Sequence, residues 1–185
     1  MLSKKYIESH DIDWFCIING IFVHVASDGG ALPNLQRFWH LRELQLFVAH
    51  LPVKHKYEIS PEIYVNKDND LENLTEDNFK KVFPEAEDIP SFGQYSNNTS
   101  KAYLWSFINM ARRGFYSFDR VGTNDNGVDM YSLVAWPTDE VENLDLPTKD
   151  QISVKIASKD FDLQRLESGA RINLVEMINL TANIC

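Results

Sequence analysis

The sequence predicts a single α+β domain over residues 1–185, with a mainly antiparallel sheet built from hairpins and several packed helices. Three observations predict this class. Apolar runs of strand-forming residues flank Asn19-Gly20, and two more such runs flank a Gly- and Asn-rich loop at 122–127. Helical patterns lie between these hairpins instead of alternating with single strands. The 185 residues, 44% of them hydrophobic, suffice for one core.

The elements follow in order from local signals. After the first hairpin, Pro33 suits a first helical turn and Pro52 a stop, which predicts a helix over 33–51. A Tyr- and Ile-rich stretch, 56–65, reads as an extended segment, and Pro61 within it indicates an edge strand or bulge. A short helix is expected over 75–82.

Residues 85–98 lack regular patterning and are expected to form a mobile loop. The second half of the sequence then predicts a helix over 100–113 capped by Gly114, strands over 115–121, 128–136 and 151–157, and a helical tail from Asp160. Gly169 is a candidate break in that tail. The segment 172–180 fits either a helix or a strand.

Composition excludes some classes of function. Eighteen basic against 27 acidic residues give a net charge of -9, which disfavours nucleic acid and anionic membranes as partners. The first residues lack the apolar core of a signal peptide, and no apolar run is long enough to cross a membrane. A cytoplasmic location is therefore expected. The two cysteines form neither a disulfide framework nor a metal-ligand cluster.

The Asn19-Gly20 turn fixes the register of the first hairpin, because a two-residue turn pairs Ile18 with Ile21 and each preceding residue with its counterpart. One face of the hairpin is then wholly apolar and is expected to face the core. It consists of Trp14, Cys16, Ile18, Ile21, Val23 and Val25. On this face Cys16 is expected to be inert packing.

The other face of the hairpin brings Asp13 diagonally opposite His24. A carboxylate beside an imidazole raises its pKa and fixes its tautomer, as a general base requires. Ser27 and Asp28 follow at the same end, before a flexible Gly29-Gly30 pair. The pattern favours a half-buried histidine satisfied by a carboxylate, with a catalytic His24–Asp13 pair as the alternative.

Two further places offer ligand-binding residues. Arg42 falls on the apolar side of the first helix, where a guanidinium needs a carboxylate partner, so it is either a structural ion pair or a residue that binds an anionic group. Asp119 and Arg120 alternate in a strand whose neighbours are aromatic, so one of the two must face inward. Neither the 122–127 loop nor His40, His50 and His55 has metal-ligand spacing, and no metal or cofactor is expected.

No catalytic motif is present, so whether the protein is an enzyme stays open. The leading hypothesis is a ligand- or protein-binding accessory module for a small molecule or a protein partner. One alternative is a small hydrolase or transferase with His24 as general base, Asp13 orienting it and Arg42 holding an anionic group. Another is an acidic immunity- or inhibitor-type protein that covers a basic partner.

Overall fold

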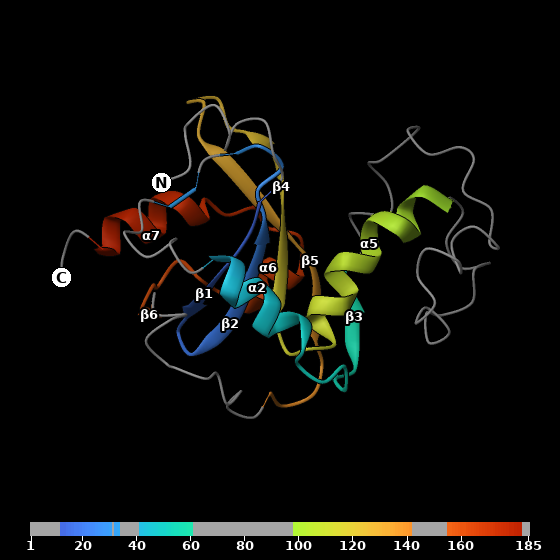
Figure 1. The fold of residues 1–185 in the computed structure, drawn as a ribbon. Helices are drawn as coiled ribbons and strands as arrows, with labels where there is room; N and C mark the ends of the chain where they lie inside the picture. Colours follow the sequence, from blue (N-terminus) through green and yellow to red (C-terminus); the bar gives the residue numbers. More distant parts are fainter. Residues whose placement is uncertain (1–11, 31, 34–40, 61–97, 142–154, 183–185) are drawn as a thin grey trace.

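The computed structural model describes residues 12–30, 32–33, 41–60, 98–141 and 155–182 (Figure 1). The strands are β1 (Asp13–Ile18), β2 (Ile21–Ala26), β3 (Tyr57–Ile59), β4 (Tyr116–Thr123), β5 (Asp129–Pro137) and β6 (Lys155–Ile156). The helices are α2 (Leu41–Ala49), α5 (Asn98–Ala111), α6 (Leu163–Glu167) and α7 (Leu174–Ala182).

The strands form one sheet in the order β3-β5-β4-β2-β1-β6. The hairpins β1–β2 and β4–β5 are antiparallel, as is β3 against β5, whereas β2 pairs with β4 and β1 with β6 in parallel. The α+β class is confirmed, but the prediction of a mainly antiparallel sheet is wrong because the sheet is mixed. The two strands of each hairpin are antiparallel. The parallel pairs, β2 with β4 and β1 with β6, form between strands that are distant in the sequence.

The first hairpin has the predicted register in all its pairs, from Ile18 with Ile21 to Asp13 with Ala26. Asn19 (φ 52°) and Gly20 (φ 84°) both adopt the left-handed conformation that a type I′ turn requires. Because side chains alternate along a strand, this register determines which residues share a face.

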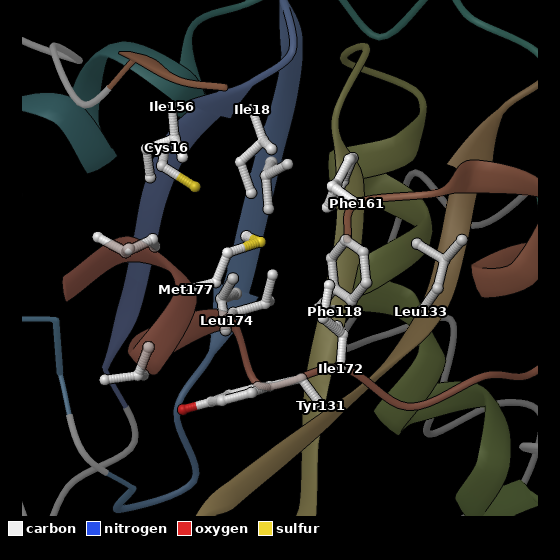
Figure 2. Packing of buried hydrophobic residues seen from close by; sticks show 14 of the residues in the cluster. Cys16, Ile18, Phe118, Tyr131, Leu133, Ile156, Phe161, Ile172, Leu174 and Met177 are labelled. Carbon is white, nitrogen blue, oxygen red and sulfur yellow. The ribbon is translucent and has the colours of Figure 1, made fainter. Parts of the chain in front are cut away.

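The predicted core face packs against the C-terminal third of the sequence. Trp14, Cys16, Val23 and Val25 are fully buried in a cluster with residues of α6 and α7. Figure 2 shows Phe118 of β4 beside Phe161, and their ring centroids are 6.1 Å apart. The core placement of Cys16 is confirmed, and burial raises the pKa of its thiol.

The other face of the sheet is also covered, by α2 and α5 (Figure 1). Phe15, Ile17 and Phe22 are buried there with Val48 of α2 and Phe115. Next to them, Ala26 packs with α5 side chains such as Leu104 and Ile108. The central strands are therefore apolar on both faces, and a polar side chain among them must find a partner inside the protein.

Several local predictions hold. The helix expected over 100–113 is α5, and Gly114 (φ 95°) follows its end in the left-handed conformation. The expected edge segment at 56–65 contains β3, which lies at the edge of the sheet. Helix α2 lies within the helix expected over 33–51, of which residues 34–40 are outside the described residues. Strand β6 lies within the strand expected over 151–157.

Other predictions need correction or lie outside the described residues. The helical tail expected from Asp160 begins only at Leu163, and Asp162 caps α6, because its side chain accepts from the backbone N–H groups of Gln164 and Arg165. Gly169 (φ 96°) breaks the tail as expected, and 172–180 is mostly helix, although Ile172 forms an isolated bridge with Tyr131. The helix at 75–82 and the loop at 85–98 lie outside the described residues, except Asn98, which begins α5.

Asn19 also fastens the distant β6 segment to the first hairpin. Its backbone N–H donates to the carbonyl of Ile156 (2.8 Å). Its side-chain amide donates to the carbonyl of Ser158 (2.8 Å) and accepts from the N–H of Ser158 (2.9 Å). Asn19, which the type I′ turn favours, therefore also hydrogen-bonds Ser158, a residue 139 positions away in the sequence.

Asn19→Gly is expected to lower the free energy of unfolding by about 2 kcal/mol, as judged by urea denaturation. Glycine keeps the left-handed turn but loses both side-chain hydrogen bonds, each contributing about 1 kcal/mol. Asn126→Gly is the matched control, since Asn126 is an exposed loop residue. Equal effects at the two positions would show that the Ser158 contacts add no stability.

Candidate functional site

His24 lies on the α5 face of β2, between β1 and β4. Its Nδ1 is 2.6 Å from Ser117 Oγ on β4, and its Nε2 is 3.4 Å from Asp13 Oδ1 on β1. The rings of Phe15 and Phe107 lie beside it, with centroids 5.3 and 6.1 Å away. We call Asp13, His24 and Ser117 the His24 cluster. The predicted proximity of Asp13 and His24 is therefore present in the structure.

The partners of the imidazole indicate its tautomer. An ionised carboxylate can only accept, so Nε2 carries the proton that faces Asp13. Nδ1 is then free to accept from the hydroxyl of Ser117. The Nε2 contact, at 3.4 Å, is longer than a well-formed hydrogen bond, and its contribution is mainly electrostatic.

Asp13 joins this buried cluster to the surface, since its side chain is 41% exposed whereas that of His24 is 1% exposed. Burial by itself would raise the pKa of the Asp13 carboxyl, but the His24 imidazole that faces it at 3.4 Å outweighs burial and holds the pKa below its ordinary value of 3.8. The backbone carbonyl of Asp13 accepts from Gln45 Nε2 of α2 (3.1 Å). Helix α2 is thereby attached to the same strand end.

The lowered pKa of Asp13 predicts a stability that depends on pH. A carboxyl whose pKa is lower in the folded state stabilises the fold above the unfolded-state pKa, and this contribution is lost as pH falls through the folded-state value. The Asp13→Asn variant should therefore be less stable than the parent near neutrality, with the gap closing below about pH 3.8. Urea unfolding of both proteins across pH measures the gap, and a gap independent of pH would contradict the prediction.

Two members of the His24 cluster, His24 and Ser117, are shielded from solvent, whereas Asp13 is partly exposed. His24 is 1% exposed, with the rings of Phe15 and Phe107 beside it, and Ser117 is fully buried. A general base must come within hydrogen-bond reach of the proton that it removes. The low exposure of His24 and Ser117 therefore opposes direct access of a substrate to the imidazole.

Arg120 makes a second polar group with the turn that follows β2. Its Nε donates to Asp129 Oδ1 of β5 (2.7 Å), and its Nη1 lies 3.5 Å from the carbonyl oxygen of Asp28. Asp28 (φ 42°) lies in a turn closed by the Gly30 N–H, which donates to the carbonyl of Ser27 (2.7 Å). We call Asp28, Gly30, Arg120 and Asp129 the Arg120 cluster.

Asp119 and Arg120 point to opposite faces of β4, as neighbours in a strand must. Asp119 is buried, which agrees with the expectation that one of the two faces inward, and it pairs with Ala26 of β2 on the α5 face. The pKa of Tyr131, which lies opposite Arg120 in the β4–β5 pairing, is raised first by burial and then by the charges of Asp129 and Asp119, while Arg120 opposes the rise. By its position in β4, Asp119 lies on the same face as the His24 cluster.

The predicted site residues thus divide into separate groups. Asp13 and His24 lie together, and Asp28 lies beside Arg120, while the buried Ser27 hydroxyl accepts from the backbone N–H of Ile12 (2.9 Å). Arg42 belongs to α2, but its side chain is outside the described part of the structure. A contact between Arg42 and the aspartates stays a prediction.

Two residues of these groups were not singled out from the sequence. Ser117 joins His24 because β2 and β4 are parallel neighbours, and Asp129 joins Arg120 as the diagonal neighbour across the β4–β5 pairing, where Arg120 lies opposite Tyr131. Alternation in 115–121 placed Ser117 on one face with Asp119, but it gave no partner strand. Ser117 could have been identified as a partner of His24 only if the pairing of β2 with β4 had been known.

Comparison with known proteins adds no relatives. No protein-family model, no curated protein and no solved structure matches the sequence. Its function must therefore be inferred from its own residues.

Within the described residues, no three His, Cys, Asp or Glu side chains gather in a way that could hold a metal ion. None of the described helices is long and apolar enough to cross a membrane.

Proposed function

We propose that the protein is a binding or accessory module that recognises a small ligand or a protein partner without chemical turnover. The observation that carries this proposal is the 1% exposure of His24, the general base of the alternative hypothesis. Arg120, a candidate ligand-binding residue, is engaged by Asp129 and by the turn at Asp28. In both clusters, polar side chains join strands and a turn, as structural groups do.

The net charge of -9 favours a basic protein as the partner, in the manner of an acidic immunity or inhibitor protein. Exposed charges on such a surface attract the partner over about a Debye length, so the affinity should fall steeply with salt. Candidate partners are captured on the full-length protein from the source lysate, purified, and then titrated by calorimetry at low and high salt. A partner that binds with no salt dependence would contradict this form of the proposal.

Asp28→Asn provides a sharp variant for that titration. Asn tolerates the left-handed conformation of Asp28 (φ 42°), so the turn is kept while a carboxylate is removed. If Asp28 takes part in recognising a basic partner, the variant should bind more weakly with unchanged thermal stability. Absence of any binding partner, together with turnover that requires His24, would overturn the binding proposal.

A hydrolase or transferase is the second candidate, and the position of Ser117 favours it. Ser117 Oγ is 2.6 Å from one imidazole nitrogen and a carboxylate faces the other, the connectivity of a nucleophile, base and orienting acid. The ring nitrogens are exchanged relative to the usual serine hydrolase arrangement, and burial opposes access. A fluorophosphonate probe tests the idea, because it should label the native protein but not Ser117→Ala if Ser117 is a nucleophile.

A further inference from the structure

Two Asn–Gly dipeptides, Asn19-Gly20 and Asn126-Gly127, each lie in the loop of a hairpin. In such a pair the backbone nitrogen of the glycine can attack Cγ of the asparagine amide. A new bond forms between that nitrogen and Cγ, the bond between Cγ and Nδ2 breaks, and Nδ2 leaves as ammonia. Water then opens the cyclic imide to aspartate or isoaspartate, so the only co-reactant is water and nothing is oxidised or reduced.

We propose that Asn126 is a site of spontaneous deamidation and that the fold protects Asn19. Glycine favours the reaction at both positions, because it has no Cβ to hinder the attack and leaves the backbone free to rotate. The sequence therefore does not distinguish the two sites. Their hydrogen bonds in the folded protein do.

At Asn19 both ends of the side-chain amide are held. Nδ2 donates to the Ser158 carbonyl (2.8 Å), and Oδ1 accepts from the Ser158 N–H (2.9 Å). The backbone N–H of Asn19 is held by the Ile156 carbonyl (2.8 Å), and the turn lies between two fully paired strands. Cγ can turn toward the Gly20 nitrogen only after both side-chain bonds break.

At Asn126 the side chain is exposed and makes no hydrogen bond within the described residues. The loop is closed by Asn124, whose Oδ1 accepts from the N–H groups of Asn126 and Val128 (3.0 Å each). The Gly127 nitrogen donates to the Asn124 carbonyl (2.9 Å), and this bond must open before the attack. The side-chain amide of Asn126 is thus not held by any hydrogen bond among the described residues. The reaction there is opposed by the hydrogen bonds of the exposed β4–β5 loop.

Deamidation would change both the charge and the backbone of this loop. The new carboxylate adds a negative charge beside Asp125, in a protein whose net charge is already -9. Isoaspartate also inserts a methylene into the backbone, which displaces the two N–H groups that Asn124 holds. The β4–β5 loop should therefore become more acidic and less ordered as the protein ages.

The test incubates the full-length protein at mildly alkaline pH, once folded and once in denaturant, and follows both dipeptides by peptide mapping with mass spectrometry. In the folded protein Asn19 should react about fivefold or more slowly than Asn126, since at least one additional hydrogen bond must open. In denaturant the two rates should converge. Asn126→Ser should abolish the first acidic species on ion exchange. Equal rates in the folded protein, or faster reaction at Asn19, would overturn the proposal.

Discussion

His24→Ala is expected to lower the free energy of unfolding by about 3 kcal/mol, seen in urea unfolding as a lower midpoint with little change in slope. The substitution leaves a cavity between Phe15 and Phe107, and it removes the partner of the buried Ser117 hydroxyl. Both effects are large at a buried position such as His24, because no water molecule replaces the lost contacts. The melting temperature should fall by roughly 10 °C for a domain of this size.

His50→Ala is the matched control. His50 is exposed, and among the described residues its ring hydrogen-bonds the carbonyl of Leu46 in the preceding helix (2.6 Å), so its loss should change stability by less than about 0.5 kcal/mol. Ser117→Ala should cost about 1–2 kcal/mol, because the His24 Nδ1 atom then remains buried without a donor. The double variant should be less destabilised than the sum of the two, since each removes the same contact.

These stability values also separate the two candidate functions. If His24 is a catalytic base, His24→Ala should abolish turnover while the fold stays intact. If it is a structural group, the same variant should unfold more readily. A His24→Ala protein with unchanged stability would refute the structural role, and it would revive the hydrolase or transferase hypothesis.

The parts of the fold that could be predicted from sequence are the local ones. The Asn19-Gly20 turn determined the pairing of β1 with β2, and that pairing alone placed Trp14 and Cys16 in the core and Asp13 beside His24. In the same way, the position of Gly114 marked the end of α5. Each of these inferences uses residues close in sequence, for which backbone geometry leaves few alternatives.

What could not be predicted is how distant elements meet. The pairing of β2 with β4 joins segments about 90 residues apart in the sequence, and no local pattern specifies that it is parallel (Val23 with Tyr116). The sheet was therefore expected to be mainly antiparallel, and Ser117 was missed as a partner of His24. The coverage of the second sheet face by α5 was missed for the same reason, and with it the burial of His24.

Gly30→Ala is expected to destabilise the protein by about 2 kcal/mol, although Gly30 is not in the left-handed region. A Cβ at this position would lie 2.5 Å from Cδ and 2.8 Å from Nε of Arg120, and 2.8 Å from the backbone oxygen of Ser27. The Arg120 guanidinium and its stem can move, but only by weakening the contact with Asp129. The Ser27 oxygen is backbone in a closed turn, and its displacement strains the hydrogen bond to the Gly30 N–H.

A double-mutant cycle with Arg120→Ala separates these two contacts. In the Arg120→Ala background the clash with the side chain is gone, so Gly30→Ala should cost less than in the parent, but the contact with Ser27 keeps the cost above zero. Gly127→Ala serves as the control, because its Cβ would meet nothing within 4 Å and its cost of about 1 kcal/mol comes only from φ (+73°). If Gly30→Ala costs the same with and without Arg120, the guanidinium does not pack on the turn, and Asp28 and Arg120 do not form one cluster.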